Sequence, residues 1–198
     1  MSLPALAAVI DLEYVPWGNA YFVTEKCKGA GGYELLSRRC YDTVCGAEAV
    51  SRPPDCFKGE LICQNGEGEC KADRYAACAK QKAGKVASKY MPYVVCIDKP
   101  FQGGPSPSGL DITALAASCA SSTGLGALSA AIENCVATAE GDGVVQAEAM
   151  ATPSHGFCPY VTIDGQELPD KDQFLSAICA AHPGAPLAGC PAPGSQFV

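Results

Sequence analysis

Residues 159–181 read PYVTIDGQELPDKDQFLSAICAA, and the predicted fold depends on them. The first five residues are rich in β-branched and aromatic side chains, which favour a strand. The Asp164-Gly165 pair that follows is a strong signal for a hairpin turn, and Glu167 begins the returning strand. Residues 169–181 predict an amphipathic helix with four side chains on one side, Phe174, Leu175, Ile178 and Cys179. The segment therefore predicts a β-hairpin followed by a helix.

The sequence before this hairpin is mainly helical in pattern. Apolar residues recur at intervals of three or four between Ala72 and Tyr90, which predicts a long helix from about residue 69. We expect Pro92 to end or kink this helix, because proline has no N–H to donate. Three further helices are predicted, over residues 111–121 with Asp111 as the N-cap, over 128–139 and over 144–150.

The first third of the chain is less regular. Residues 7–16, AAVIDLEYVP, alternate apolar and polar side chains and predict a strand that ends at the turn formed by residues 17–19. Residues 21–62 lack periodicity. We expect this part to be an insertion held by two disulfides among its four cysteines, Cys27, Cys40, Cys45 and Cys56.

The order of these elements is a strand, a long helical insert, a hairpin and a helix. It is typical of the C-terminal part of an α/β, thioredoxin-like fold with an inserted helical subdomain. The N-terminal strand and the first helix of that fold are not visible in this sequence. We predict one thioredoxin-like domain over residues 1–190, with a Cys-rich insertion (21–60), a helical insert (70–151), a hairpin with its C-terminal helix (159–181), and a flexible tail (191–198).

Composition excludes several classes of function. The 198 residues are 48% hydrophobic, which is enough to form a core, and they carry a formal net charge of −7. Lysine and arginine are spread thinly, which argues against binding to nucleic acid or to an acidic membrane surface. No run of about 18 apolar residues predicts a membrane span, and we expect no cofactor.

Thirteen cysteines are distributed through the whole chain, which indicates disulfides formed in an oxidising compartment. Zinc is the alternative, but the sequence has no Cys-x-x-Cys and only two histidines, so we expect no metal site. Residues 1–10 do not resemble a signal peptide. Because the number of cysteines is odd, one is left over if twelve form disulfides. The sequence leaves the pairing open.

Residues 63–78, CQNGEGECKADRYAAC, resemble the signature motif of the gamma-interferon-inducible lysosomal thiol reductase (GILT) family. That family has Cys-Gln-His-Gly, two residues, Glu-Cys, and a further cysteine eight residues on. Six positions match, namely Cys63, Gln64, Gly66, Glu69, Cys70 and Cys78, whereas Asn65 stands where the family has histidine. Residues 15–20 (VPWGNA) and 159–165 (PYVTIDG) are also similar to segments of the family.

The resemblance implies a thioredoxin-like fold and the reduction of disulfides in protein substrates, in lysosomal or other endomembrane compartments or after secretion. In the family, a Cys-x-x-Cys at the N-terminus of the first helix performs the reaction. This chain has no such pair, so we expect its reductase activity to be absent or impaired. The alternative is a non-catalytic, disulfide-stapled secreted domain that binds peptides or proteins. The oligomeric state is left open.

Cys63 and Cys70 have two interpretations. They could form a redox couple, but six residues separate them where such a pair usually has two. A structural disulfide is favoured, and closing this loop contributes about 2.5 kcal/mol before native-state strain is counted. Gln64 and Glu69 either shape a substrate groove or serve the local structure, and Glu69 suits the cap of the following helix.

Cys158 and Pro159 are the other candidates. The resemblance places Pro159 at the wall of the active site, where thioredoxin-like proteins usually have a cis-proline. Cys158 stands where the family commonly has valine, so it is a candidate for the leftover thiol. The alternative is a buried or disulfide-bonded cysteine. His155, three residues earlier, is interpreted as a loop residue without a role.

Overall fold

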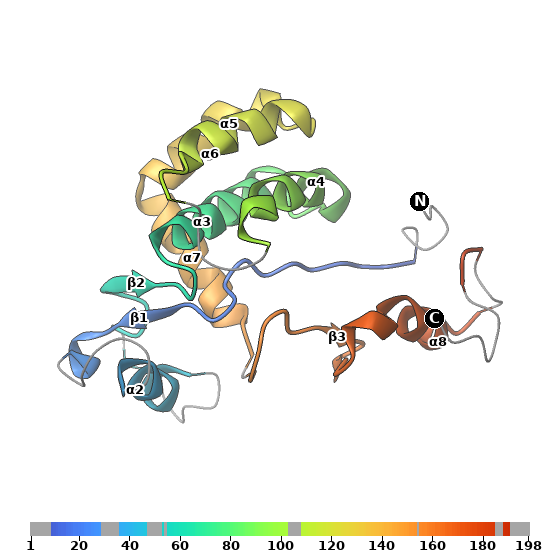
Figure 1. Ribbon diagram of the computed structural model, residues 1–198, viewed down its shortest axis with the longest axis horizontal. Helices are drawn as coiled ribbons and strands as arrows, with labels where there is room; N and C mark the ends of the chain where they lie inside the picture. The colour runs from blue at the N-terminus through green and yellow to red at the C-terminus, as the bar shows by residue number, and fades with distance from the viewer. Residues whose placement is uncertain are drawn as a thin grey trace. The chain divides into compact units, whose positions relative to one another are not determined.

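The computed structural model of the chain describes residues 9–28, 36–46, 53, 55–102, 108–153, 155–184 and 188–190. The chain divides into two compact units. The larger unit is formed by residues 13–156, and the smaller unit by residues 1–12 together with 157–198 (Figure 1). Each unit is described by itself.

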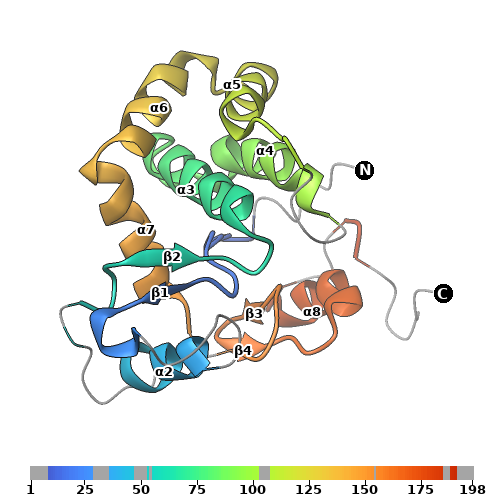
Figure 2. The same cartoon turned by 60° about the vertical axis from the view of Figure 1, so that its left-hand side comes forward.

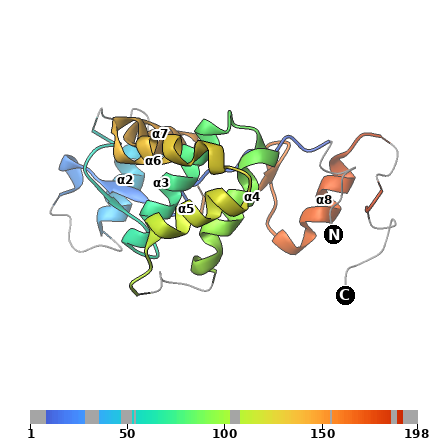
Figure 3. The ribbon, with the colours of Figure 1, turned by 90° about the horizontal axis from the view of Figure 1, so that it is seen from above.

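Five helices form the body of the larger unit. They are α3 (Glu67–Lys82), α4 (Ala87–Asp98), α5 (Ile112–Ser122), α6 (Ser129–Ala137) and α7 (Ala139–Ala151). The helix α3 packs against each of the other four (Figures 2 and 3). Its buried face is mostly alanine, which allows close approach, and larger side chains from its neighbours, such as Tyr93, Ile97 and Ile132, complete the core.

Two disulfides cross this core. Cys78 on α3 is joined to Cys135 on α6, and Cys96 on α4 is joined to Cys119 on α5. Cys78, Cys119 and Cys135 are fully buried. Four of the five helices are therefore joined covalently in two separate pairs, α3 with α6 and α4 with α5.

The end of α3 differs from the prediction. Gly84 and Lys85 adopt positive φ values of 69° and 59°, and the N–H of Lys85 donates to the carbonyl of Lys80 at 2.9 Å. This is the hydrogen-bond pattern of a glycine-terminated helix. Pro92, the predicted terminator, lies inside α4. It removes only one hydrogen bond from a helix whose buried residues hold it against α3.

The helix predicted after Asp111 is confirmed. The Asp111 carboxylate accepts the backbone N–H groups of Thr113 and Ala114 at 3.0 and 3.1 Å, and α5 begins at Ile112. These bonds satisfy two N–H groups that have no partner within the first turn. The other two predicted helices correspond to α6 and to α7, which begins five residues earlier than expected.

A two-stranded antiparallel sheet belongs to the larger unit. It pairs β1 (Tyr21–Val23) with β2 (Glu60–Ile62), and Tyr21 lies opposite Ile62. The helix α2 (Leu36–Cys45) packs against β1. Residues 21–62 are thus more regular than predicted. The two expected disulfides are present, as Cys27–Cys40 and Cys45–Cys56, and an aromatic cluster that includes Trp17, Phe22 and Tyr41 is buried beside them.

The strand predicted over residues 7–16 is wrong in its described part. Residues 9–15 contain no strand, and Val9 and Leu12 are 44% and 38% exposed. A strand requires a hydrogen-bonded neighbour. Within the described residues, the only strand pairs are β1 with β2 and β3 with β4. The alternating apolar residues 9–15 therefore have no neighbouring strand to pair with.

The smaller unit contains the predicted hairpin. It is formed by β3 (Thr162–Ile163) and β4 (Gln166–Glu167), joined by Asp164 and Gly165, which have φ values of 49° and 78°. Positive φ at both central residues matches the right-handed twist of a hairpin, and glycine adopts it without steric cost.

The predicted C-terminal helix follows the hairpin, but it starts later than expected. A 3₁₀ turn (Lys171–Gln173), capped by the Asp170 carboxylate, leads into α8 (Phe174–Ala181). The disulfide Cys179–Cys190 ties α8 to the segment that follows it. None of the side chains of α8 is fully buried. Phe174 is 41% exposed, and Leu175, Ile178 and Cys179 are partly buried, so the expected apolar side is covered only in part.

The described residues are therefore mainly helical, with two small antiparallel sheets, which is consistent with the predicted α/β class. The remaining short elements are the 3₁₀ turns Glu25–Cys27, Lys99–Phe101 and Gly126–Leu128. None of the helices in the described ranges has the length and apolar character needed to cross a bilayer.

Candidate functional site

The signature segment forms a closed loop at the start of α3. Cys63, which follows β2, is joined to Cys70 in the first turns of α3 by a disulfide with a Cα–Cα distance of 5.5 Å. Gly66 immediately precedes the helix with φ of +91°, a conformation that side chains other than glycine rarely adopt. The glycine of the motif is thus required by the turn between β2 and α3.

The Glu69 carboxylate closes this loop from inside. Its Oε2 accepts the backbone N–H of Asn65 at 2.6 Å, and its Oε1 accepts the side-chain Nδ2–H of the same residue at 3.1 Å. Glu69 was expected at the cap of the helix. It lies instead two residues inside α3, and its carboxylate reaches back beyond the first residue, in the manner of a capping box.

A second polar group lies against the same loop. Asn19, in the turn before β1, donates from Nδ2 to Gln64 Oε1 at 2.9 Å. Its Oδ1 is 3.1 Å from Nε2 of His155, which follows α7. The backbone carbonyl of Asn19 accepts a hydrogen bond from Arg38 on α2. Three segments far apart in sequence therefore meet at one asparagine.

His155 was predicted to be a loop residue without a role, and no local pattern could have assigned it one. His155 and Asn19 are 136 positions apart in the chain, so their contact depends on how α7 packs against the rest of the unit. The sequence signals were the similarity of residues 15–20 to a segment of the family, which includes Asn19, and the signature motif, which includes Gln64; neither pointed to His155.

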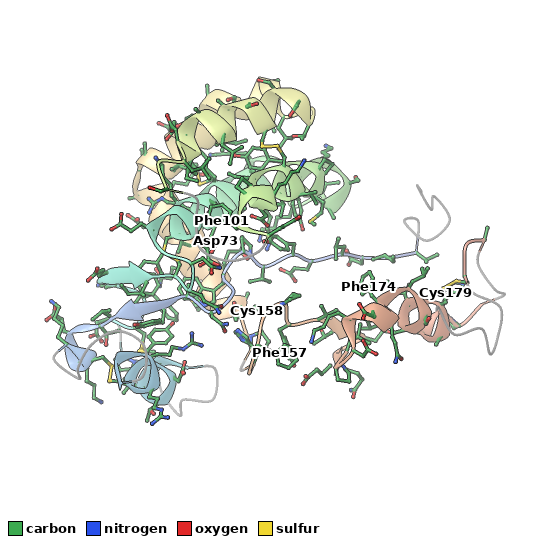
Figure 4. The ribbon with its side chains drawn as sticks, in the orientation of Figure 1. Asp73, Phe101, Phe157, Cys158, Phe174 and Cys179 are labelled. Carbon is green, nitrogen blue, oxygen red and sulfur yellow. A yellow bond between two sulfur atoms is a disulfide. The ribbon has the colours of Figure 1, made fainter. Side chains whose placement is uncertain are left out.

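A group of carboxyl residues lies between α3 and the end of α4. The Tyr14 hydroxyl donates to Asp98 Oδ2 at 3.0 Å. Burial, and then the charge of Glu69, raises the pKa of Asp98 to about 6, against the opposing effect of the Tyr14 hydrogen bond. Burial, followed by the charges of Glu69 and Asp98, raises the pKa of Asp73 well above its ordinary value. Figure 4 shows Asp73 on α3.

The remaining site residues are found elsewhere. Cys78 lies further along α3, where it forms the core disulfide with Cys135. Cys158 and Pro159 are in the smaller unit, and the peptide bond between them is cis, as expected. Cys158 is exposed and is the cysteine that the six disulfides leave over. Figure 4 labels Cys158 and the neighbouring Phe157. The Lys171 ammonium lies 3.5 Å from the centroid of the Phe157 ring.

Chemically, the loop and the side chains that lie against it offer one disulfide, three amides, the Glu69 carboxylate and one imidazole. The described residues contain no group of three or more His, Cys, Asp or Glu side chains arranged to hold a metal ion. The polar groups are suited to hydrogen bonding with a peptide or with one another, and the sulfur atoms are the groups with redox chemistry.

Comparison with known proteins agrees with the resemblance seen in the motif. The model of the family described as gamma interferon inducible lysosomal thiol reductase (GILT) matches residues 43–123. A gamma-interferon-inducible lysosomal thiol reductase from Carassius auratus is 26% identical over 194 residues. The match covers 93% of this chain and 61% of that relative. The predicted resemblance to the GILT family is therefore confirmed, and the chain spans less than two thirds of the relative.

Proposed function

We propose that this chain is part of a thiol–disulfide oxidoreductase of the GILT type, which reduces disulfides in protein substrates. The observation that carries the proposal is the signature segment, where Cys63, Gly66, Glu69 and Cys70 form one closed loop. The similarity of residues 43–123 to the family supports it. The six disulfides fit a lysosomal, endomembrane or secreted location.

The reaction proceeds in two exchanges. A thiolate of the enzyme attacks one sulfur of the substrate disulfide, which gives a mixed disulfide and releases the other sulfur as a thiolate. A second enzyme thiol then attacks the mixed disulfide, forms an enzyme disulfide and releases the reduced substrate. A dithiol reductant restores the enzyme. This cycle needs two neighbouring thiols, and the 198 residues contain no Cys-x-x-Cys.

The proposed domain is thioredoxin-like over residues 1–190, with the hairpin and α8 as its C-terminal part and the helices of the larger unit as its insert. In that arrangement Pro159 forms the wall of the active site. The Cys63–Cys70 disulfide has a structural role, because it closes the loop that leads into α3.

An insulin-reduction assay tests the activity. We expect the 198-residue chain with dithiothreitol to reduce insulin no faster than dithiothreitol alone, because it lacks the dithiol pair. Mapping the 5′ end of the transcript supplies the comparison. If the reading frame extends upstream to a Cys-x-x-Cys, the extended protein should reduce insulin. A complete protein without that pair, or one that leaves insulin oxidised, would refute the proposed reductase.

A second candidate is a non-catalytic, disulfide-stapled secreted domain that binds peptides or proteins. The lack of a Cys-x-x-Cys in these residues favours it. The two functions are separated by incubating the chain with a disulfide-containing peptide and analysing the product under non-reducing conditions. A covalent adduct at Cys158 supports thiol–disulfide exchange. Retention of the peptide without a covalent bond supports the binding domain.

A further inference from the structure

The loop of residues 63–70, which we call the signature loop, is closed twice, once by a covalent bond and once by a carboxylate. Cys63 and Cys70 form the disulfide, with a Cα–Cα distance of 5.5 Å. Glu69 accepts the backbone N–H of Asn65 at 2.6 Å and its side-chain Nδ2–H at 3.1 Å. Glu69 directly precedes Cys70, and Asn65 lies two residues after Cys63. The polar contact therefore spans almost the same segment of the chain as the disulfide.

The backbone of the signature loop also forms hydrogen bonds of its own. The Gly66 N–H donates to the Cys63 carbonyl at 3.2 Å, and the Gly66 carbonyl accepts the N–H of Glu69 at 3.1 Å. Gly66 has a positive φ of 91° at the point where α3 begins. The contact of Glu69 with Asn65 fixes this turn, because it joins the residue before Gly66 to the first turn of the helix.

The stability of a disulfide depends on where its two thiols lie after reduction. If the chain holds the thiols close together, the bond forms again readily. If the chain lets them separate, the entropy of closing the loop opposes the bond. Cys63 is 5% exposed within the core of the larger unit, whereas Cys70 lies in α3. The contacts within the intervening residues therefore help to decide how far the two thiols can separate.

From this geometry we infer that Glu69 is a positioning residue for the Cys63–Cys70 disulfide, because its two hydrogen bonds to Asn65 keep the signature loop closed and so make the disulfide harder to reduce. A carboxylate suits this task, since its two oxygens accept both N–H groups of one residue. Its charge acts in the same direction, because a carboxylate disfavours a neighbouring thiolate and hence the reduced form. The inference concerns the loop itself and does not rest on the proposed function.

Equilibration of the oxidised 198-residue protein with mixtures of reduced and oxidised dithiothreitol at pH 7 tests the inference. The reduced reagent gives two electrons and two protons to the disulfide, which becomes two thiols, and the reagent becomes a cyclic disulfide. Alkylation and peptide mass spectrometry then give the equilibrium constant for reduction of Cys63–Cys70. We expect Glu69→Ala to increase this constant by at least about tenfold, because both hydrogen bonds are lost. Asn65→Ala, which loses only the side-chain bond, should increase it about two- to tenfold.

Matched controls separate positioning from loss of charge and from general destabilisation. Glu67→Ala removes an exposed carboxylate of the same helical turn and should change the constant less than about twofold. Glu69→Gln keeps one acceptor, so its constant should lie between those of the unmodified chain and Glu69→Ala. The Cys45–Cys56 disulfide, followed in the same samples, should keep its constant in every variant.

Four results would overturn the inference. They are an equal shift in Glu67→Ala and Glu69→Ala, a Glu69→Gln as impaired as Glu69→Ala, an unchanged constant in Asn65→Ala, and a shift of the Cys45–Cys56 disulfide as large as that of the signature loop. If Glu69→Ala does not fold, Asn65→Ala still gives the answer, because it leaves the carboxylate and the backbone bond in place. None of these measurements depends on reductase activity.

Discussion

At the scale of single residues, Gly141 shows how closely α6 and α7 approach α3. Arg74 donates to the carbonyls of Val136 and Thr138 at this corner, and a Cβ on Gly141 would lie 2.6 Å from both the Arg74 side chain and the backbone oxygen of Cys135. Because backbone cannot give way cheaply, we expect Gly141→Ala to lower the free energy of unfolding by about 1–3 kcal/mol. Gly143→Ala, on the same helix with open space around it, should be neutral or stabilising by up to about 1 kcal/mol. Urea unfolding of the oxidised proteins measures both, and equal effects would contradict the argument.

At the scale of elements, three ion pairs join α3 to α7, and the two made by lysines differ in burial. Lys80 Nζ is 2.9 Å from Glu148 Oε2, with side chains only 5% and 9% exposed, whereas the Lys82–Glu140 pair is 24% and 39% exposed. Burial raises the pKa of Glu148 while Lys80 lowers it, so removing Lys80 leaves a costly buried carboxylate. We expect Lys80→Met to destabilise the protein by about 3 kcal/mol and Lys82→Met by less than about 1 kcal/mol.

Chemical denaturation measures both losses of stability. A Lys80→Met, Glu148→Leu double variant should recover most of the loss caused by Lys80→Met. Similar losses for the two lysines would show that burial does not decide the cost.

At the scale of the whole molecule, the buried carboxyl groups make stability depend on pH. The pKa of Asp98 is raised to about 6 and that of Asp73 well above its usual value, chiefly by burial. The native state then holds more protons than the unfolded chain, so stability is fully present below about pH 4 and is lost as pH rises through the folded values. For Asp98 alone this amounts to about 2–3 kcal/mol between pH 4 and pH 7. Thermal unfolding should give a higher midpoint at pH 5 than at pH 7.5.

The matched variants for this test are Asp98→Asn and Asp73→Asn, which should each reduce the difference between the two pH values. Asn at position 98 keeps an acceptor for the Tyr14 hydroxyl. Asp142→Asn, which changes a carboxylate that is 73% exposed, is the control and should preserve the difference. A midpoint that rises from pH 5 to pH 7.5 in the unmodified chain would contradict the assignment.

The features that the sequence predicted correctly are those determined by neighbours in the chain. The Asp164-Gly165 turn and the Asp111 cap each depend on a few adjacent residues, and both are present. Features that depend on distant partners were missed. The strand expected over residues 7–16 needed a neighbouring strand, and the contact of His155 with Asn19 needed α7 to be packed. The end of α3 was misplaced because the prediction relied on Pro92. The helix ends earlier, at the turn formed by Gly84, and Pro92 lies inside the next helix, α4.

The site was predictable to a similar extent. The closed loop between Cys63 and Cys70 followed from the motif, since six intervening residues suit a local bridge. The buried environment of Asp73 and Asp98 did not, because no pattern in the sequence brings the end of α4 beside α3. Burial is a property of the assembled core, and the pKa values follow from it.

The six disulfides are nested and none crosses another. Five of them join cysteines that follow one another in the order of cysteines along the chain, and one of these, Cys96–Cys119, lies wholly inside the sixth, Cys78–Cys135. During synthesis, a rule that each emerging cysteine pairs with the one just before it therefore produces the native bonds almost everywhere. Cys78 and Cys158 are the exceptions, because each has to escape pairing with the next cysteine to emerge. Cys78 has to stay reduced for the roughly 3–11 s that ribosomes need to add the 57 residues to Cys135. The native pairing formed during translation thus depends on two thiols, those of Cys78 and Cys158, remaining unoxidised while the next cysteine emerges.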